Sequence, residues 1–374
     1  MRKLFSKTWF KNIFSSVICV ILGFIISYIV LLFINPSNAH IAIFNVILNF
    51  FNFHNIILQL MNFGSTLVKT APLIMCALSV IFCYKAGLFN IAVAGEYCTG
   101  ICVSLLCAIT FKWNWIFCIL AAIVAGLLVG LIIGLFKTIF NVNEVISGIM
   151  VNWIILYLTN YLLANYTDKS SAPYTVHLVY SNPSSMIPNL GLDKLFAGNS
   201  YVTISVVFTV LIAIIIQIVI NKTKFGFEIK ATGFNKDAAK AAGMKEKKNI
   251  ALTLMIGGGL AALGASFLYL TDIEQWKTTV TNIPNMGFDG IAAAFLGCVN
   301  PVGAIFSSYL IEHITCGGAY IDTSMFSSQV SSLVSSIIIY LCGFSFFIKY
   351  IIEKIELKKS QTKPDNKSVG RKEE

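Results

Sequence analysis

The chain has 374 residues, of which 57% are hydrophobic and only 12% are charged. An average soluble domain carries about 25% charged residues, and roughly half of any globular surface must face water. This composition therefore excludes an ordinary soluble domain and indicates a membrane protein, whose apolar surface is solvated by lipid. A net charge of +10 is also found in nucleic-acid-binding proteins, but the placement of the charges argues against that class.

Twenty of the 27 Lys and Arg residues lie in three groups beside apolar runs. Four precede the first run, eight lie within 222–248 and eight lie within 349–372. Basic segments beside membrane spans stay in the cytoplasm, so we expect membrane lipid, and no nucleic acid, as a partner. The expected divisions are a basic cytoplasmic N-terminus at 1–12, a membrane domain at 13–348 and a basic, disordered cytoplasmic tail at 349–374.

Apolar runs near the roughly 20-residue length of a membrane span recur along the chain. We expect ten transmembrane helices, at Ile13–Ile34, Leu67–Tyr84, Ile91–Phe111, Ile116–Phe136, Val145–Asn165, Tyr201–Asn221, Asn249–Leu270, Gly287–Cys298, Val302–Ile321 and Val330–Ile348. Ten crossings place both termini in the cytoplasm, together with the basic loop 222–248. Segment 35–64 has no charged residue and is expected to form a short interfacial helix outside, and 166–200 is expected to form an extracytoplasmic loop.

A short internal similarity links two parts of the chain. Phe89–Gly95 (FNIAVAG) resembles Phe288–Ala294 (FDGIAAA), because each joins an aromatic residue and a small amide or acid to small residues. In the ten-span topology these segments open spans of opposite orientation. Inverted repeats with broken helices near the midplane are a common plan of transporters. The sequence therefore predicts an all-α polytopic membrane protein with two inverted, repeat-like halves.

Motifs of soluble and membrane enzymes are missing from the chain. It contains no GxxxxGK[ST] phosphate loop, no HExxH and no GxSxG pattern, so we expect no nucleotide hydrolysis and no catalytic residues. Most of the ten cysteines lie inside apolar runs and none form a CxxC pair. Such thiols behave as small hydrophobic side chains, so we expect no metal site.

The basic loop 222–248 contains a signal for a short helix. Asn235 is a good N-cap, Lys236–Ala242 favours helix, and Gly243 suits a C-terminal turn. The expected helix is alanine-rich on one side and basic on the other. One interpretation is a solvated linker that satisfies the rule for basic cytoplasmic loops. The other is a docking helix whose alanine face fits a groove on a partner protein.

Three further segments join this loop in resembling one family, in the same order along the chain. They are Gly87–Ile91 (GLFNI), Asn143–Ser147 (NEVIS), and Gly287–Ala292 (GFDGIA) continuing to Asn300–Gly303 (NPVG). The chain resembles the permease subunits of bacterial ABC importers for ribose, other simple sugars and nucleosides. In its NEVIS segment and in its length, the chain is most similar to the longer permease of nucleoside importers served by Bmp-type lipoproteins. The resemblance covers Leu67–Leu341.

This resemblance implies an assembly in the bacterial inner membrane. The chain would pair with a second, homologous permease, ABC ATPase subunits would dock beneath the cytoplasmic loops, and an extracytoplasmic substrate-binding lipoprotein would deliver the solute. ATP would be bound by a partner subunit, and this chain would hold no cofactor. The implied pathway residues are Phe89, Asn90, Phe288 and Asp289. The implied ATPase-coupling residues are Gly233, Asn235, Ala238, Ala239, Ala242 and Gly243.

One departure from the family concerns a carboxylate. The family usually reads Gly-x-Glu-Gly-Gln where this chain reads Ala92-Val93-Ala94-Gly95-Glu96, so the carboxylate moves by about 200° around a helix. A carboxylate within a span should face water or a protein partner. We expect Glu96 either to line the pathway or to contact Thr99, Ser104 or another helix. Asp289, at an expected helix start, should line the pathway or cap backbone amides.

The expected function is therefore the permease subunit of an ATP-driven importer that moves a nucleoside or related sugar-containing solute inward by alternating access. The alternative is a secondary transporter or channel for a small polar solute, because such carriers also use buried carboxylates. That alternative leaves the ordered segment 235–243 without a role. A membrane-embedded enzyme is a third hypothesis, with no motif in its favour.

Overall fold

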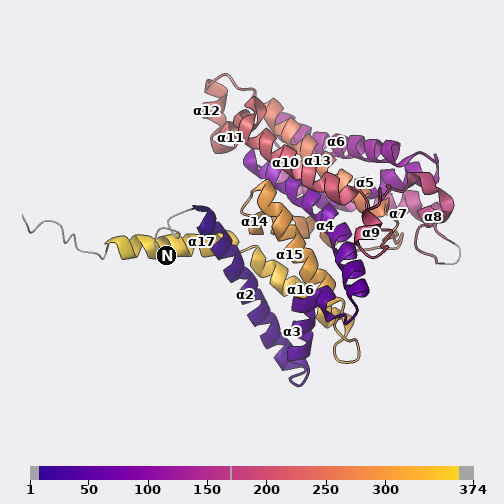
Figure 1. The fold of residues 1–374 in the computed structure, drawn as a ribbon. Coiled ribbons are helices and arrows are strands. Elements are labelled where there is room, and N and C mark those ends of the chain that lie inside the picture. The colour runs from indigo at the N-terminus through magenta and orange to yellow at the C-terminus, as the bar shows by residue number, and fades with distance from the viewer. Residues whose placement is uncertain (1–7, 169–170, 362–374) are drawn as a thin grey trace, which may run out of the picture.

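The computed structural model describes residues 8–168 and 171–361. Within these residues the chain is helical apart from turns, connecting segments and two isolated β-bridges, which confirms the expected all-α class (Figure 1). The longer helices are α2 (Thr8–Ile34), α3 (Ala39–Leu48), α4 (Ile56–Lys85), α5 (Val93–Ile109), α6 (Trp115–Ile139), α7 (Glu144–Leu163), α10 (Ser205–Lys222), α11 (Lys224–Phe234), α13 (Glu246–Tyr269), α14 (Asn285–Leu296), α15 (Pro301–Gly318), α16 (Ser328–Cys342) and α17 (Ser345–Gln361). The short ones are α8 (Leu178–Ser181), α9 (Leu192–Leu195), α12 (Lys236–Ala241) and three 3₁₀ turns, η1 (Asn49–Asn52), η2 (Ala164–Tyr166) and η3 (Pro183–Ser185).

The number of membrane-length helices is smaller than the sequence predicts. Of the described helices, six are long and apolar enough to cross a membrane alone: α2, α4, α6, α7 with the turn after it, α10 and α13. α16 and α17 make a seventh span only if they count as one element across a bend of 43°. α5 and α14 have 17 and 12 residues, and 12 residues rise only about 18 Å against about 30 Å of hydrocarbon. Several apolar runs that read as spans are therefore short or bent helices.

The centre of the bundle is formed by α4 and α13. Their apolar windows are 89% and 72% buried, against 28–33% for α2, α6, α7 and α10. α6 and α13 meet backbone to backbone, because a Cβ at Gly126 would strike the Gly258 carbonyl and one at Gly130 would strike the Leu254 carbonyl. Membrane helices associate mainly through van der Waals packing, which small residues permit at close range. These glycines therefore set the distance between α6 and α13.

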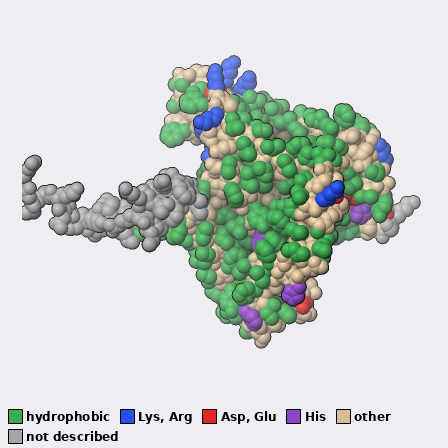
Figure 2. Space-filling view, viewed as in Figure 1, with side chains coloured by type: hydrophobic (Ala, Val, Ile, Leu, Met, Phe, Trp, Pro, Cys, Tyr) green, Lys and Arg blue, Asp and Glu red, His purple; other side chains and the backbone are tan. Residues whose placement is uncertain are grey.

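The outer surface of the bundle is apolar over a wide area. Figure 2 shows hydrophobic side chains across most of the visible face, with Lys and Arg gathered over the α11–α12 end. Phe117, Ile154 and Ile215, on three different helices, are each more than half exposed. Soluble proteins rarely expose apolar patches of such extent. The structure therefore supports a multi-pass membrane protein.

Segment 35–64 is only partly as expected. α3 and η1 occupy its first part, in agreement with a short helix there. α4, however, begins at Ile56, well before the predicted start at Leu67, because Asn55 accepts a hydrogen bond from the Ile57 N–H (2.9 Å) and caps it. The helix then continues through Pro72 to Lys85, so this segment contributes to the central helix as well as to α3.

The C-terminal tail also differs from the expectation. The sequence predicts disorder from residue 349 onward, but α17 remains helical to Gln361. Ser345–Gln361 contains no Gly or Pro and is rich in Ile, Lys and Glu, and the absence of helix breakers allows it to extend α16 beyond the bend. The rest of the expected tail (362–374) and the expected basic residues 1–7 lie outside the described residues.

Candidate functional site

The helix signal in the basic loop corresponds to a real helix. α11 ends at Phe234, and Asn235 then caps α12 by accepting a hydrogen bond from the Ala238 N–H (3.0 Å). Gly243 follows with φ +79°, a left-handed conformation that favours glycine. Ala239 faces the protein, whereas Asn235, Ala238 and Ala242 are exposed. The loop thus presents small side chains at one end of the bundle.

This helix pair contacts the turn that follows α4. A Cβ at Gly233 would lie 2.5 Å from the Lys85 carbonyl oxygen and 2.7 Å from the Gly87 amide nitrogen. Gly87 itself has φ +70°, and a Cβ there would lie 2.9 Å from the Gly233 carbonyl oxygen. The backbones of these two glycines therefore touch, and α11 packs directly against residues 85–87.

A buried polar cluster lies just beyond that turn. Asn90 donates to Glu96 Oε2 (2.9 Å) and to Ser79 Oγ (3.2 Å), and its Oδ1 accepts from the Ala92 N–H. Asn152 of α7 accepts from the Gly95 N–H (2.7 Å). Asn90 and Glu96 are thus brought together, and both are buried.

The sequence did not identify which side chain contacts Glu96, and the structure shows that it is Asn90. Thr99 donates instead to the Gly95 carbonyl, and Ser104 to the Ile101 carbonyl. Glu96 has no exposed surface in this conformation. A pathway role for Glu96 therefore requires a movement that opens the cluster around it.

The other expected pathway residues make different contacts, although the start of α14, which carries Phe288 and Asp289, packs against α5 at Ala94. Phe89 stacks on Phe295, with ring centroids 6.1 Å apart, and Phe288 is 41% exposed. Asp289 lies one turn inside α14, which begins at Asn285 with Pro284 at its N-cap position. It therefore does not cap that helix, since capping side chains stand before the first turn. The capping interpretation of Asp289 is wrong.

Asp289 lines a cavity that the sequence did not predict. The cavity has a volume of about 440 Å³ and lies among α14, α15 and α16. Asn285, Thr315 and Ser336 contribute further polar side chains to its wall. These residues stand on three helices, and a serine or threonine in an apolar run carries no sequence signal for a shared wall.

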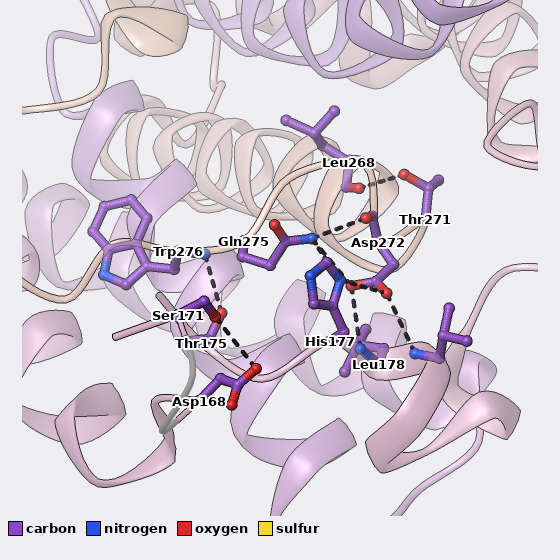
Figure 3. Close-up of polar contacts among 11 residues, drawn as sticks. Asp168, Ser171, Thr175, His177, Leu178, Leu268, Thr271, Asp272, Gln275 and Trp276 are labelled. Atoms are coloured by element: carbon purple, nitrogen blue, oxygen red, sulfur yellow. Dashed lines mark hydrogen bonds and ion pairs between the residues drawn. The ribbon is translucent and has the colours of Figure 1, made fainter. Parts of the chain in front are cut away.

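A second feature that the sequence did not predict is a polar contact at the end of the bundle opposite α12. It joins the segment between η2 and α10 to the segment between α13 and α14. Asp272, directly after α13, accepts from the Leu178 N–H (3.1 Å) and the Val179 N–H (3.3 Å), and lies 3.2 Å from His177 Nδ1. Gln275 donates to the Asp272 carbonyl (3.0 Å). Figure 3 shows these contacts converging on Asp272. This carboxylate therefore holds the start of α8 against the end of α13.

Removal of this carboxylate should loosen the connecting segment 166–200. Asp272→Ala leaves two N–H groups near α8 without their acceptor, at a cost of about 1–3 kcal/mol for each one buried. We expect limited proteolysis within 166–200 to become at least about fivefold faster, at unchanged membrane insertion. Asp193→Ala in α9 of the same segment is the matched control and should cleave at the wild-type rate. Equal cleavage of both variants would contradict the assigned contact.

Comparison with known proteins places the chain in a family. The family model described as branched-chain amino acid transport system / permease component matches residues 62–343, and the chain belongs to this family. The guanosine ABC transporter permease protein NupP of Bacillus subtilis is 30% identical over 79% of this chain and 84% of its own length. The nucleoside ABC transporter permease protein NupB of Lactococcus lactis is 25% identical over 78% and 81%. No solved structure matches.

A third relative is named for a different solute, a sugar. The glucose ABC transporter permease protein TsgB13 of Haloferax volcanii is 27% identical over 77% of this chain and 78% of its own length. These matches confirm the resemblance to ABC importer permeases for nucleosides and sugars. Such permeases are transport subunits, not enzymes, and they work with an ATPase and a substrate-binding protein.

Proposed function

We propose that this chain is one of two homologous membrane subunits of an importer in the bacterial plasma membrane. It moves a nucleoside or a related sugar-containing solute inward by alternating access, driven by a separate ABC ATPase that binds the ATP. A substrate-binding lipoprotein delivers the solute from outside. The contact of Gly233 with residues 85–87 carries this proposal, because it joins an exposed cytoplasmic helix to the buried cluster around Asn90.

The mechanism begins at the exposed face of α12. Asn235, Ala238 and Ala242 are accessible to a partner, and small side chains allow a docking groove to approach the helix closely. ATP binding closes the ATPase subunits and displaces α11–α12. Gly233 transmits that displacement to the turn after α4, whose next residues include Phe89 and Asn90. The pathway then changes access from one side of the membrane to the other.

The proposed topology retains ten crossings, both termini in the cytoplasm and two inverted halves. The two similar segments support this arrangement, since they pack against each other at their helix starts: a Cβ at Gly287 would lie 2.5 Å from the Ala94 Cα. Short helices α5 and α14 then serve as the broken helices near the midplane. Phe89, Asn90, Glu96, Phe288 and Asp289 are the proposed pathway residues.

The experiment that tests this function is uptake by the complete complex in proteoliposomes. We expect uptake to require ATP and to stop when the ATPase carries a hydrolysis-blocking substitution. Uptake that follows an ion gradient with no ATPase present would instead establish a secondary transporter. A labelling reagent that reaches α12 only from the extracellular side of intact cells would also overturn the proposal.

Removal of the α12 cap should impair coupling specifically. Asn235→Ala removes the acceptor for the Ala238 N–H, at a cost of about 0.5–2 kcal/mol, and we expect ATP-driven uptake to fall several-fold. Asn114→Ala is the matched control, because Asn114 caps α6 in the same way through the Ile116 N–H (3.1 Å) but lies away from the α11–α12 end. Equal uptake by both variants would count against docking at α12.

A further inference from the structure

The cavity among α14, α15 and α16 has room for a small solute. Its volume of about 440 Å³ falls within the roughly 300–1,000 Å³ of small-molecule sites. It reaches from the second turn of α14, at Asp289, to Ile321 and Thr323 in the segment after α15. A solute that enters beside that segment therefore meets Asp289 within the bundle.

Two hydroxyl groups of the cavity wall have their hydrogens engaged in helix hydrogen bonds. Thr315 Oγ1 donates its hydrogen to the Ile311 carbonyl (3.0 Å) and Ser336 Oγ donates to the Ser332 carbonyl (2.8 Å). With its hydrogen engaged in this way, each hydroxyl offers lone pairs to a ligand. An ionised Asp289 accepts at both carboxylate oxygens. The wall therefore suits a solute that is rich in O–H or N–H donors.

The charges near the cavity disfavour an anion. Glu312 of α15 is buried and lies close enough to Asp289 to interact with it electrostatically. The nearby Lys69 is paired with Glu274 (3.0 Å), so its charge is already balanced. Among the described residues, the wall carries the carboxyl group of Asp289 and neither Lys nor Arg, so it offers no cation to a phosphate or carboxylate ligand. A nucleoside or free sugar fits this arrangement, and a nucleotide does not.

We propose, on the basis of the function proposed above, that Asp289 binds two neighbouring hydroxyl groups of a sugar ring, one with each carboxylate oxygen. For a nucleoside these are the 2′ and 3′ hydroxyls of the ribose. A carboxylate accepts such paired donors strongly because the hydrogen bonds are charge-assisted. Guanosine and glucose, named for two of the relatives, both carry neighbouring ring hydroxyls. Thr315 and Ser336 accept from the remaining donors of the solute.

The test compares ribonucleosides with 2′,3′-dideoxynucleosides in ATP-driven uptake by the complete complex. The binding lipoprotein is the same in every sample, so its own preference cancels when variants are compared. We expect the wild-type preference for guanosine over 2′,3′-dideoxyguanosine to shrink at least about tenfold in Asp289→Asn, because the amide replaces one acceptor oxygen by a donor. An unchanged preference would overturn the proposal.

Asp322→Asn is the matched control for this substitution. Asp322 lies in the segment between α15 and α16, outside the cavity wall, where the Ser324 N–H donates to its Oδ1 (2.8 Å). That hydrogen bond lowers the pKa of the Asp322 carboxyl, so this carboxylate is engaged by a backbone N–H two residues further along the chain. We expect its variant to keep the wild-type preference. A preference that shrinks equally in both variants would mean that the loss is not due to the cavity carboxylate.

Two further variants decide the matter if Asp289→Asn transports neither solute. Asp289→Glu displaces the paired acceptor oxygens by one methylene group and Asp289→Ser removes the carboxylate, and the proposal requires the preference to shrink in at least one. An unchanged preference in both overturns it. Uptake that needs no ATP but still shows the Asp289-dependent preference would refute the proposed function and support the diol site. ATP-driven uptake without that dependence would refute the diol site alone.

Discussion

Gly233→Asn is expected to lower ATP-driven uptake at least about tenfold while the chain still inserts into the membrane. The new Cβ would lie 2.5 Å from the Lys85 carbonyl oxygen and 2.7 Å from the Ala86 carbonyl carbon. Both are backbone atoms of the turn after α4, which cannot move aside as a flexible side chain can. Overpacking of this kind costs about 1–3 kcal/mol, so α11 must separate from the turn.

Separation at Gly233 breaks the connection between α12 and the cluster around Asn90. The expected signature is therefore a complex that binds ATPase but transports slowly. Co-purification of the ATPase and solute uptake measure these two properties separately. Gly191→Asn is the matched control: Gly191 has φ +85°, which asparagine tolerates, and a Cβ there meets no atom within 4 Å. Normal uptake by the Gly233 variant would refute the proposed connection.

Gly126→Leu is expected to destabilise the folded chain more than any other substitution proposed for this protein. The Cβ would strike the Gly258 carbonyl and the Ala262 side chain, so the added leucine must push α6 away from the central helix α13. Separation of two helices in lipid loses their van der Waals contact and has no hydrophobic compensation. We expect the melting temperature of the detergent-solubilised complex to fall by at least about 5 °C.

Val124→Leu provides the comparison for this stability measurement. It creates the same residue two positions earlier on α6, where the side chain is 54% exposed on the outer surface. Leucine is as well solvated by lipid as valine, so the melting temperature should stay near the wild-type value. A similar decrease in both variants would show that the glycine contact is not what holds α6 and α13 together.

The local features of the cytoplasmic loop could be predicted from the sequence. Asn235 caps α12, and Gly243 takes a left-handed conformation after it, as their residue types indicate. A cap and a C-terminal turn each involve groups within a few residues of one another. The same sequence could not show that Gly233 touches Gly87, because that contact joins segments separated by almost 150 positions.

The pathway residues show where prediction from the sequence ends. The sequence predicts that Glu96 lines the pathway or contacts Thr99, Ser104 or another helix, whereas the structure pairs it with Asn90 across the turn before α5. Asp289 was expected at a helix start, and α14 begins earlier, at Asn285. Helix boundaries shift by a turn without changing the apolar pattern, but such a shift moves a side chain from a cap into a cavity.

The amino-acid sequence alone indicates a helical protein embedded in a membrane, because apolar content and basic flanking segments reflect the solvent around each part of the chain. It also located α12 from its capping residues. The folded structure was needed to show which apolar runs have membrane length, that Asn90 contacts Glu96, and that Asp272 holds α8. These depend on side-chain contacts between segments far apart in sequence, which packing selects and no local pattern encodes.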